Sequence, residues 1–579
     1  MFHIRRTRGG TGIAPQFANT RRQVRVDQAP IKGVHFGLRL AELEPGWAAH
    51  TQNFIVNKGA LRPRSGTSKA LTGVPATNAA GALSIGPVAI QGGSLAFEAD
   101  GDPVAIFGSK THLLRGEPVD GVVTQMAPLF GSAPSLRSDE YWSTSYMFDQ
   151  GTNETQAVFC QERFKPKYFS TIGATYSDYT FFADVGFAKA GSVVAADNRL
   201  VFANIVETDG TQQATRVGWT RRGSFSDWTL NLGAGFEDIR DMRGKIIWLH
   251  PMDDDGFLLF TTEEVWRARP RRDVAAFDFA PISREVSCPY PLTIQTTVAG
   301  VTFLGKDFEV WAMRGGQLVS MGKRPQAQQE ESSRVQGYIR DTVTNAKRAF
   351  GVYSHQAKEY QLFYPQGDDF ASNGYATRAL TYDFDADAWM TQAYSEEYSF
   401  GLDFVQAGLL TSNAQWDQAV GTWDSQTSTW DEYGVSIQHD PNVRRPLMFS
   451  SRATMSQPYR DRTADSMGST VLAEWRSGGL RHPEVDPWRR VWVIEHTPEW
   501  ANGGAASTAS VAWTDNDGAS FFEERQFSTP NSGISATLVP VRFGGRFPQF
   551  EVRSSGNTVE WTRFSTVFYG DSPRGGGTG

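Results

Sequence analysis

Pairs of short apolar strands that recur along the chain constrain its fold more than any other feature of the sequence. One pair lies in 244–270, where GKIIWLH is followed by GFLLFTTEEVWRARP, and another in 299–321, AGVTFLGKDFEVWAMRGGQLVSM. The theme returns in 348–389 as RAFGVYSHQAKEYQLFY and RALTYDFDADAW. Units of three or four short strands therefore recur about every 40–60 residues, the length of one propeller blade.

This pattern predicts an all-β chain, with a β-propeller body, additional antiparallel β domains and an extended N-terminal arm. We expect a hairpin in 53–67, NFIVNKGALRPRSGT, with its turn at 57–59. The best helix candidate, around 325–345, is short and polar. A β-sandwich array is the main alternative, and the sequence fixes neither the number nor the order of the blades.

Changes in composition and in the spacing of apolar runs divide the chain into four expected parts. These are an N-terminal arm in 1–45, a propeller body in 46–400, a loop-rich insertion in 401–470, and a C-terminal antiparallel β domain in 471–579 that closes the propeller and ends in a disordered tail. The arm is rich in arginine and is either a floppy tail or a segment that docks on a neighbouring subunit or touches phosphate. Its arginines are Arg5, Arg6, Arg8, Arg21, Arg22 and Arg25.

Composition excludes several classes of protein. The chain has 56 Lys and Arg against 63 Asp and Glu, a net charge of −7, which argues against a protein coated by nucleic acid. Cys160 and Cys288 are too few for a disulfide framework and favour a reducing compartment. No apolar run approaches membrane-spanning length, and the N-terminus lacks the apolar core of a signal peptide, so we expect no membrane insertion.

Motifs for catalysis are missing from the sequence. It contains no Walker A loop, dinucleotide fingerprint, HExxH, CxxC or G-x-S-x-G elbow. The alternating Asp383, Asp385 and Asp387 lack the Gly and terminal Glu of a calcium loop, so we interpret them as a strand that leads into a turn. Adjacent carboxylates at 253–255 point in different directions and make a weaker metal site still. We therefore predict no enzyme, and no catalytic, cofactor-binding or metal-binding residues.

The segment TDNDGASFF in 514–522 resembles the Asp-box hairpin of sialidase-like propellers. That box holds a tight turn and says nothing of catalysis by itself. A sialidase would also need an arginine cluster, a tyrosine nucleophile and several boxes, so glycosidase activity is a minority interpretation.

Three Trp-Asp dipeptides follow one another at seven-residue spacing in 415–434, QWDQAVGTWDSQTSTWDEYG, at Trp416, Trp423 and Trp430. Gly421 and the many Ser, Thr and Asp residues disfavour a helix, and a coiled coil would need a second apolar column. An odd spacing would send successive tryptophans to opposite faces of a strand. A chain of short turns, each pinning one tryptophan, is the preferred interpretation, and a sugar-binding ladder the second.

Several segments, in this order, resemble the tail nozzle or tail hub proteins of short-tailed bacteriophages, also called packaged-DNA stabilisation or tail tubular B-type proteins. The likeness extends over most of 46–570, although Ser65 interrupts the usual Arg-Pro-Gly ending of the first segment and the Asp-Gly loop near the end is one residue short. The segments are GWAAHTQNFIVNKGALRPRSGT, NRLVFAN, RVGWTRRGSFSDW, LLFTTEEVWRA, EVSCPYPLTIQTTVAGVTFLGKDFEVWAMRGGQL, LTYDFDADAWMTQ, the Trp-Asp repeat, SVAWTDNDGASFFEE, and LVPVRFGGRFPQFEVRSS with Phe543, Gly544, Gly545 and Arg546.

The resemblance implies a structural virion protein without catalysis. Such proteins form a ring of identical subunits, usually six, below the portal and the head-to-tail adaptor, and fibres or spikes attach outside. The ring holds and then conducts double-stranded DNA without sequence-specific binding. A charge of −7 per subunit becomes about −42 over six copies, which suits a conduit that must not retain DNA. The alternatives are a carbohydrate-binding or sialidase-like propeller, and a peripheral receptor-binding tail component.

Overall fold

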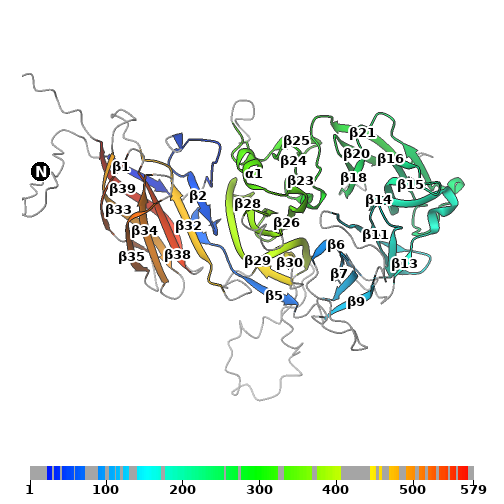
Figure 1. Ribbon diagram of the computed structural model, residues 1–579, viewed down its shortest axis with the longest axis horizontal. Helices are drawn as coiled ribbons and strands as arrows, with labels where there is room; N and C mark the ends of the chain where they lie inside the picture. The colour runs from blue at the N-terminus through cyan, green and yellow to red at the C-terminus, as the bar shows by residue number, and fades with distance from the viewer. Residues whose placement is uncertain are drawn as a thin grey trace, which may run out of the picture.

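The computed structural model describes most of the chain as two β-rich bodies, which lie side by side along the longest axis of the molecule (Figure 1). The described residues are 23–28, 32–39, 42–57, 59–71, 89–97, 103–110, 112–117, 122–128, 140–170, 176–252, 256–271, 276–323, 332–367, 374–405, 444–450, 455–458, 469–480, 491–502, 507–515, 520–529, 534–536, 538–545, 548–555 and 559–570. The expected all-β chain with a propeller body and further antiparallel sheets is confirmed.

Five four-stranded antiparallel sheets follow one another along the chain, each starting at its innermost strand. Their strands are β6 (Ile90–Phe97), β7 (Pro103–Ser109), β8 (His112–Glu117) and β9 (Val122–Pro128) in blade 1; β10 (Ser143–Asp149), β11 (Glu154–Cys160), β12 (Lys167–Ser170) and β13 (Ser177–Asp178) in blade 2; β14 (Phe187–Ala196), β15 (Arg199–Glu207), β16 (Gln212–Trp219) and β17 (Gly235–Asp238) in blade 3; β18 (Ile246–Pro251), β19 (Phe257–Thr261), β20 (Val265–Pro270) and β21 (Phe277–Ser283) in blade 4; and β22 (Gln295–Thr297), β23 (Gly300–Leu304), β24 (Val310–Arg314) and β25 (Gln317–Ser320) in blade 5.

The next sheet has seven strands and supplies two blades, because the long strand β29 (Ala388–Val405) belongs to both. Its first half pairs with β28 and its second half with β30. Blade 6 consists of β26 (Phe350–Ser354), β27 (Glu359–Tyr364), β28 (Ala376–Asp383) and the first half of β29; blade 7 consists of the second half of β29, β30 (Arg444–Ser450), β31 (Met455–Pro458) and β5 (Thr67–Leu71).

The apolar cores show that these seven blades close into a ring. One buried cluster lies between each pair of successive blades, and the seventh joins Phe400 and Phe449 of blade 7 to Phe107 of blade 1. The blades follow one another around a centre in Figure 1, from blue through green to yellow. The ring closes when β5, from the N-terminal part of the chain, pairs with β31 as the outermost strand of blade 7.

The second body is a β-sandwich built from both ends of the described chain. Its two sheets enclose a core that contains Trp475, Trp500, Trp513 and Trp561. One sheet contains β1 (Gln23–Gln28), β3 (Phe54–Asn57), β4 (Ala60–Pro63), β33 (Val491–Asn502), β36 (Ile534–Ala536), β37 (Val539–Gly545) and β39 (Val559–Gly570); the other has the order β2 (Ala48–Gln52), β32 (Leu472–Ser477), β38 (Gln549–Ser555), β34 (Ser507–Thr514) and β35 (Phe522–Thr529).

This arrangement differs from the expected domain boundaries at three places. The strands in 48–63 lie in the sandwich, although we expected the propeller body to begin at 46. Strands β30 and β31 belong to blade 7, whereas 401–470 was expected to be an insertion. The propeller is closed by β5 and not by the C-terminal domain, because C-terminal strands pair with β1, β2 and β4 in the sandwich.

Local predictions agree with the structure more closely. β3 and β4 form the expected hairpin, whose Gly59 has φ +83°. The predicted helix segment contains one short helix, α1 (Gln336–Thr342). Strands β34 and β35 pair antiparallel up to Trp513 and Phe522, on either side of the predicted Asp-Gly hairpin. The innermost strands of blades 1 to 6 begin 44–59 residues apart, within the expected blade length.

Candidate functional site

Hydroxyl side chains tie the innermost strands of neighbouring blades together around the propeller axis. The buried Ser143 Oγ of blade 2 lies 3.0 Å from Ser192 Oγ of blade 3, and Ser192 Oγ accepts a 2.9 Å bond from Leu249 N of blade 4. Ser399 Oγ of blade 7 accepts a 3.1 Å bond from Ile90 N of blade 1. Since each bond satisfies a buried N–H or hydroxyl of the adjacent blade, these bonds lock neighbouring blades in register.

The junction between the propeller and the sandwich is centred on Asn53. Its side chain donates to Leu472 O of the sandwich at 2.8 Å and accepts from Ala393 N of blade 6 at 2.7 Å. Its backbone N–H donates to Thr391 O at 2.9 Å. Asn53 holds a φ of +59°, a backbone conformation that asparagine adopts more readily than most residues.

Arg64 completes this junction. Its guanidinium is buried and donates to Asn53 Oδ1 at 3.0 Å, to Ser65 O at 2.9 Å and to Ala393 O of blade 6. The guanidinium carbon also lies 4.2 Å from the ring centre of Tyr394. Both residues lie in 53–67, where the sequence predicted a hairpin but no role for Asn53 or Arg64. The juxtaposition depends on strand β29, more than three hundred residues away along the chain.

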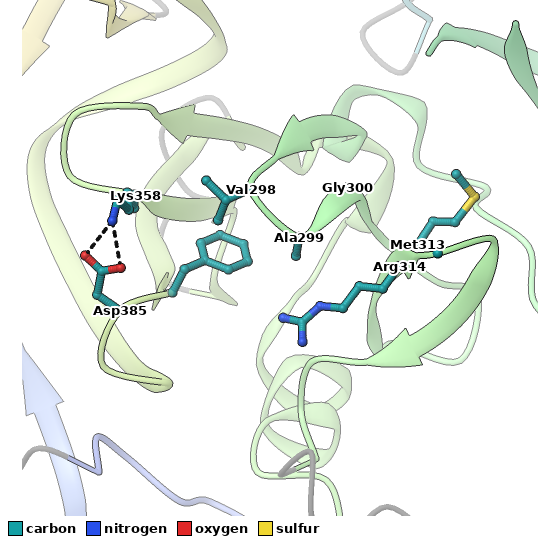
Figure 2. A pocket seen from close by; sticks show the side chains of 9 residues that line it. Val298, Ala299, Gly300, Met313, Arg314, Lys358 and Asp385 are labelled. Atoms are coloured by element: carbon teal, nitrogen blue, oxygen red, sulfur yellow. Dashed lines mark hydrogen bonds and ion pairs between the residues drawn. The ribbon is translucent and has the colours of Figure 1, made fainter. Parts of the chain in front are cut away.

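A surface pocket of about 560 Å³ lies between blades 5 and 6 (Figure 2). Four tight turns build it, all from the same end of the strands. The β22–β23 turn contributes Val298, which is 61% exposed. The β24–β25 turn contributes Arg314, and the remaining two turns contribute Lys358 and Asp385. Its other lining residues are Ala299, Gly300, Met313, Gly315 and Phe384.

The two sides of this pocket differ in charge. Lys358 Nζ lies 3.0 Å from Asp385 Oδ1, so that side is an ion pair with no net charge. Arg314 faces it from the opposite side (Figure 2), is exposed, and forms no hydrogen bond or ion pair with any of the described residues. Gly315 and Gly316 follow with φ of +55° and +84°, values typical of a type I′ hairpin turn, which sets the backbone position of Arg314.

Asp383, Asp385 and Asp387 lie at the end of a strand and in the turn that follows it, as predicted. Asp383 Oδ1 accepts hydrogen bonds from Asp385 N at 2.8 Å and Ala386 N at 2.9 Å, which is the predicted use of aspartate at a strand end. Asp387 accepts from the buried Arg334 at 2.9 Å. Among the described residues no group of three or more His, Cys, Asp or Glu is placed to hold a metal ion.

Other sequence predictions lie partly or wholly beyond the described residues. Residues 253–255 and the Trp-Asp segment 415–434 are outside them, as are 1–22 of the arm and Arg546. Val405 and Arg444, which flank the Trp-Asp segment on either side, are paired neighbours in blade 7. Cys160 and Cys288 are both buried and free, and burial raises the pKa of each thiol.

Within the described part of the chain, no helix has the length and apolar character needed to cross a membrane.

A second group of charges covers one face of the sandwich and has a structural role. The buried carboxylate of Glu551 pairs with Arg476 at 2.8 Å and with Arg553 at 2.8 Å. The ring of Phe521 lies over both guanidinium groups. Arg553 also lies 3.4 Å from Glu474, so two guanidinium groups and two carboxylates balance on the adjacent strands β32 and β38 and leave little net charge for a ligand.

Comparisons with known proteins give no family. No family model matches the chain, and no curated protein matches it. Among solved structures it is similar to YCF48 bound to D1 peptide, with 10% identity over 65% of this chain and 96% of that one and a TM-score of 0.34. It is also similar to an exo-β-1,3-galactanase from Phanerochaete chrysosporium with galactose, with 8% identity over 87% of this chain and 100% of that one and a TM-score of 0.23.

Proposed function

We propose that this protein is a structural subunit of a virus tail nozzle, and that its work is mechanical. In this proposal the protein is no enzyme and uses no cofactor. Copies form a ring below the portal and the head-to-tail adaptor, the hexamer that the resemblance to tail nozzle proteins implies. The ring retains packaged double-stranded DNA, conducts it during ejection and anchors fibres or spikes. The protein is assembled in the bacterial cytoplasm and resides in the virion tail.

The junction at Asn53 and Arg64 carries this proposal. The segment in which the resemblance to nozzle proteins begins, 46–67, is the segment that joins the sandwich to blade 6. Buried hydrogen bonds from Asn53 and Arg64 make that joint stiff, since breaking it would leave buried polar groups without partners. A part that resists the force of DNA passage needs such a joint, whereas an enzyme needs a preorganised reaction centre.

Labelling of virus particles tests the proposal. Particles that carry this chain would be treated with an antibody against it and imaged by electron microscopy. We expect the label on the tail axis, between the portal and the tip. Label at the ends of peripheral fibres would support a receptor-binding component instead, and its absence from particles would refute the proposal. Light scattering on the purified chain, alone and with portal and adaptor, measures ring formation.

A glycan array addresses the carbohydrate-binding alternative separately. Tight glycan binding by the wild-type chain that is lost in Trp423→Ala would favour that alternative. We expect no such binding, because the proposed function is mechanical.

A further inference from the structure

We propose that the pocket between blades 5 and 6 binds a segment of a partner protein that carries a carboxylate next to an apolar side chain. The carboxylate pairs with Arg314, and the apolar side chain covers Val298 and Phe384. This inference goes beyond the proposed function and does not depend on it.

The charge of the pocket selects an anion. Lys358 and Asp385 already neutralise each other at 3.0 Å, so Arg314 is the cation left over on the rim. A guanidinium remains charged at all physiological pH values and binds a carboxylate through two parallel N–H bonds. The type I′ turn at Gly315 and Gly316 directly follows Arg314 and so sets where its backbone lies at the rim of the pocket.

The apolar wall adds the second requirement. Val298 projects from its turn with 61% of its surface exposed, and the half-buried Phe384 lies in the same lining. The wall continues into the buried Ala299. Covering this surface with an apolar side chain would contribute about 25 cal/mol for each Å² removed from water.

The size of the site favours a protein segment over a small free acid. One exposed ion pair is worth about 0–1 kcal/mol in water, too little to hold a small carboxylate. The volume of about 560 Å³ accommodates several side chains, and the four turns form a continuous rim. An arginine beside an apolar pocket is also a common centre of protein interfaces, where surrounding contacts exclude water.

Selection from a displayed library of random 12-residue peptides on the full-length protein tests this inference. We expect enriched peptides to place Asp or Glu next to Leu, Ile, Val or Phe. The most enriched peptide would then be synthesised with a fluorescent label, together with a counterpart in which Asn or Gln replaces the acid. The counterpart should bind more weakly, by up to about fivefold, which is the loss of one exposed ion pair.

Matched variants locate the binding. Arg314→Glu should weaken the labelled peptide about tenfold or more, and Val298→Ser should weaken it to a smaller extent. Arg340→Glu makes the same charge change on helix α1, on a side chain that is 64% exposed and does not line the pocket, and should leave binding unchanged. Circular dichroism and melting temperature check that each variant folds, which we expect because Arg314 and Val298 are exposed.

Several results would overturn the inference. These are no enrichment, enriched peptides without acids, or binding that Arg314→Glu leaves intact. Displacement of the peptide by free 4-methylpentanoate at equal concentration would indicate a site for small acids, and displacement by an oligosaccharide would indicate a sugar site. None of these outcomes bears on where the chain lies in a virus particle, so the two proposals fail independently.

Discussion

Single residues in the sandwich make its stability depend on pH. His496 is buried among Trp513, Phe550 and Phe564, and its Nδ1 lies 3.0 Å from Thr566 Oγ1. Burial lowers the pKa of His496 to about 3 from 6.5. A histidine whose pKa is lowered on folding contributes stability above its unfolded pKa, and this contribution is lost as the pH falls from 6.5 toward 3.

His496→Phe should therefore flatten the acid side of the stability profile. The free energy of unfolding of the wild type should fall with decreasing pH between 6.5 and 3 by up to about 1.4 kcal/mol per pH unit from this one group. The variant keeps an aromatic ring in the core but has no proton to bind there. Urea denaturation from pH 7 to pH 4 measures the difference. Equal slopes for the two proteins would contradict the assignment.

Arg64 is the residue on which the junction depends most. Arg64→Ala leaves Asn53 Oδ1 and Ala393 O with fewer donors in a buried place. We expect a loss of about 1–3 kcal/mol in the free energy of unfolding. Denaturant titration measures it, with Arg340→Ala as the control, because that arginine is exposed and pairs only with its neighbour Asp341 among the described residues. An equal effect of both substitutions would remove Arg64 from its assigned role.

At the scale of the elements, the closure of the propeller depends on the pairing of two strands that are distant in the sequence. β5 and β31 are short strands, and their pairing is the one that joins the N-terminal part of the chain to blade 7. Ser68 is paired directly with Gln457 in this ladder. Residues opposite each other in an antiparallel pair lie about 4.5–5.5 Å apart at Cα, within reach of a disulfide.

A disulfide between positions 68 and 457 should therefore stabilise the ring. The double variant Ser68→Cys, Gln457→Cys closes a loop of nearly four hundred residues, for which the loop-entropy estimate is about 6 kcal/mol. We expect a higher melting temperature under oxidising conditions and none of this gain after reduction. The native Cys160 and Cys288 are buried and do not compete. Melting temperatures that do not differ between the two conditions would argue against the β5–β31 register.

At the scale of the whole molecule, the junction should make the propeller and the sandwich unfold together. β2 and β3 lie against β29, and Gln392 Nε2 donates to Phe54 O at 3.1 Å in addition to the bonds of Asn53. Asn53→Ala should separate one calorimetric transition into two, because it removes contacts to both bodies at once. Scanning calorimetry measures this. Two transitions already present in the wild type would refute the cooperative junction.

The sequence by itself determined the local structure. Apolar runs predicted the strands, Gly59 the first hairpin, and Asp383 a turn, because these depend on residues within a few positions of one another. The blade spacing followed from the repeat of such units. The role of Asn53 and Arg64, in contrast, could not be predicted, since their partners Ala393 and Leu472 are far away along the chain.

Only the tertiary structure decided how these elements are shared between the two bodies. Strands β1, β2 and β4 pair with strands from beyond residue 470, and β5 pairs with β31, so the N-terminal segment divides between sandwich and propeller. The closure of the seven blades into a ring depends on the pairing of β5 with β31, and the pocket at Arg314 forms where turns of blades 5 and 6 meet. Backbone pairing uses the same N–H and C=O groups in every strand, so the local sequence does not specify which distant strand a given strand pairs with. The packing and burial of side chains over the whole chain select that partner.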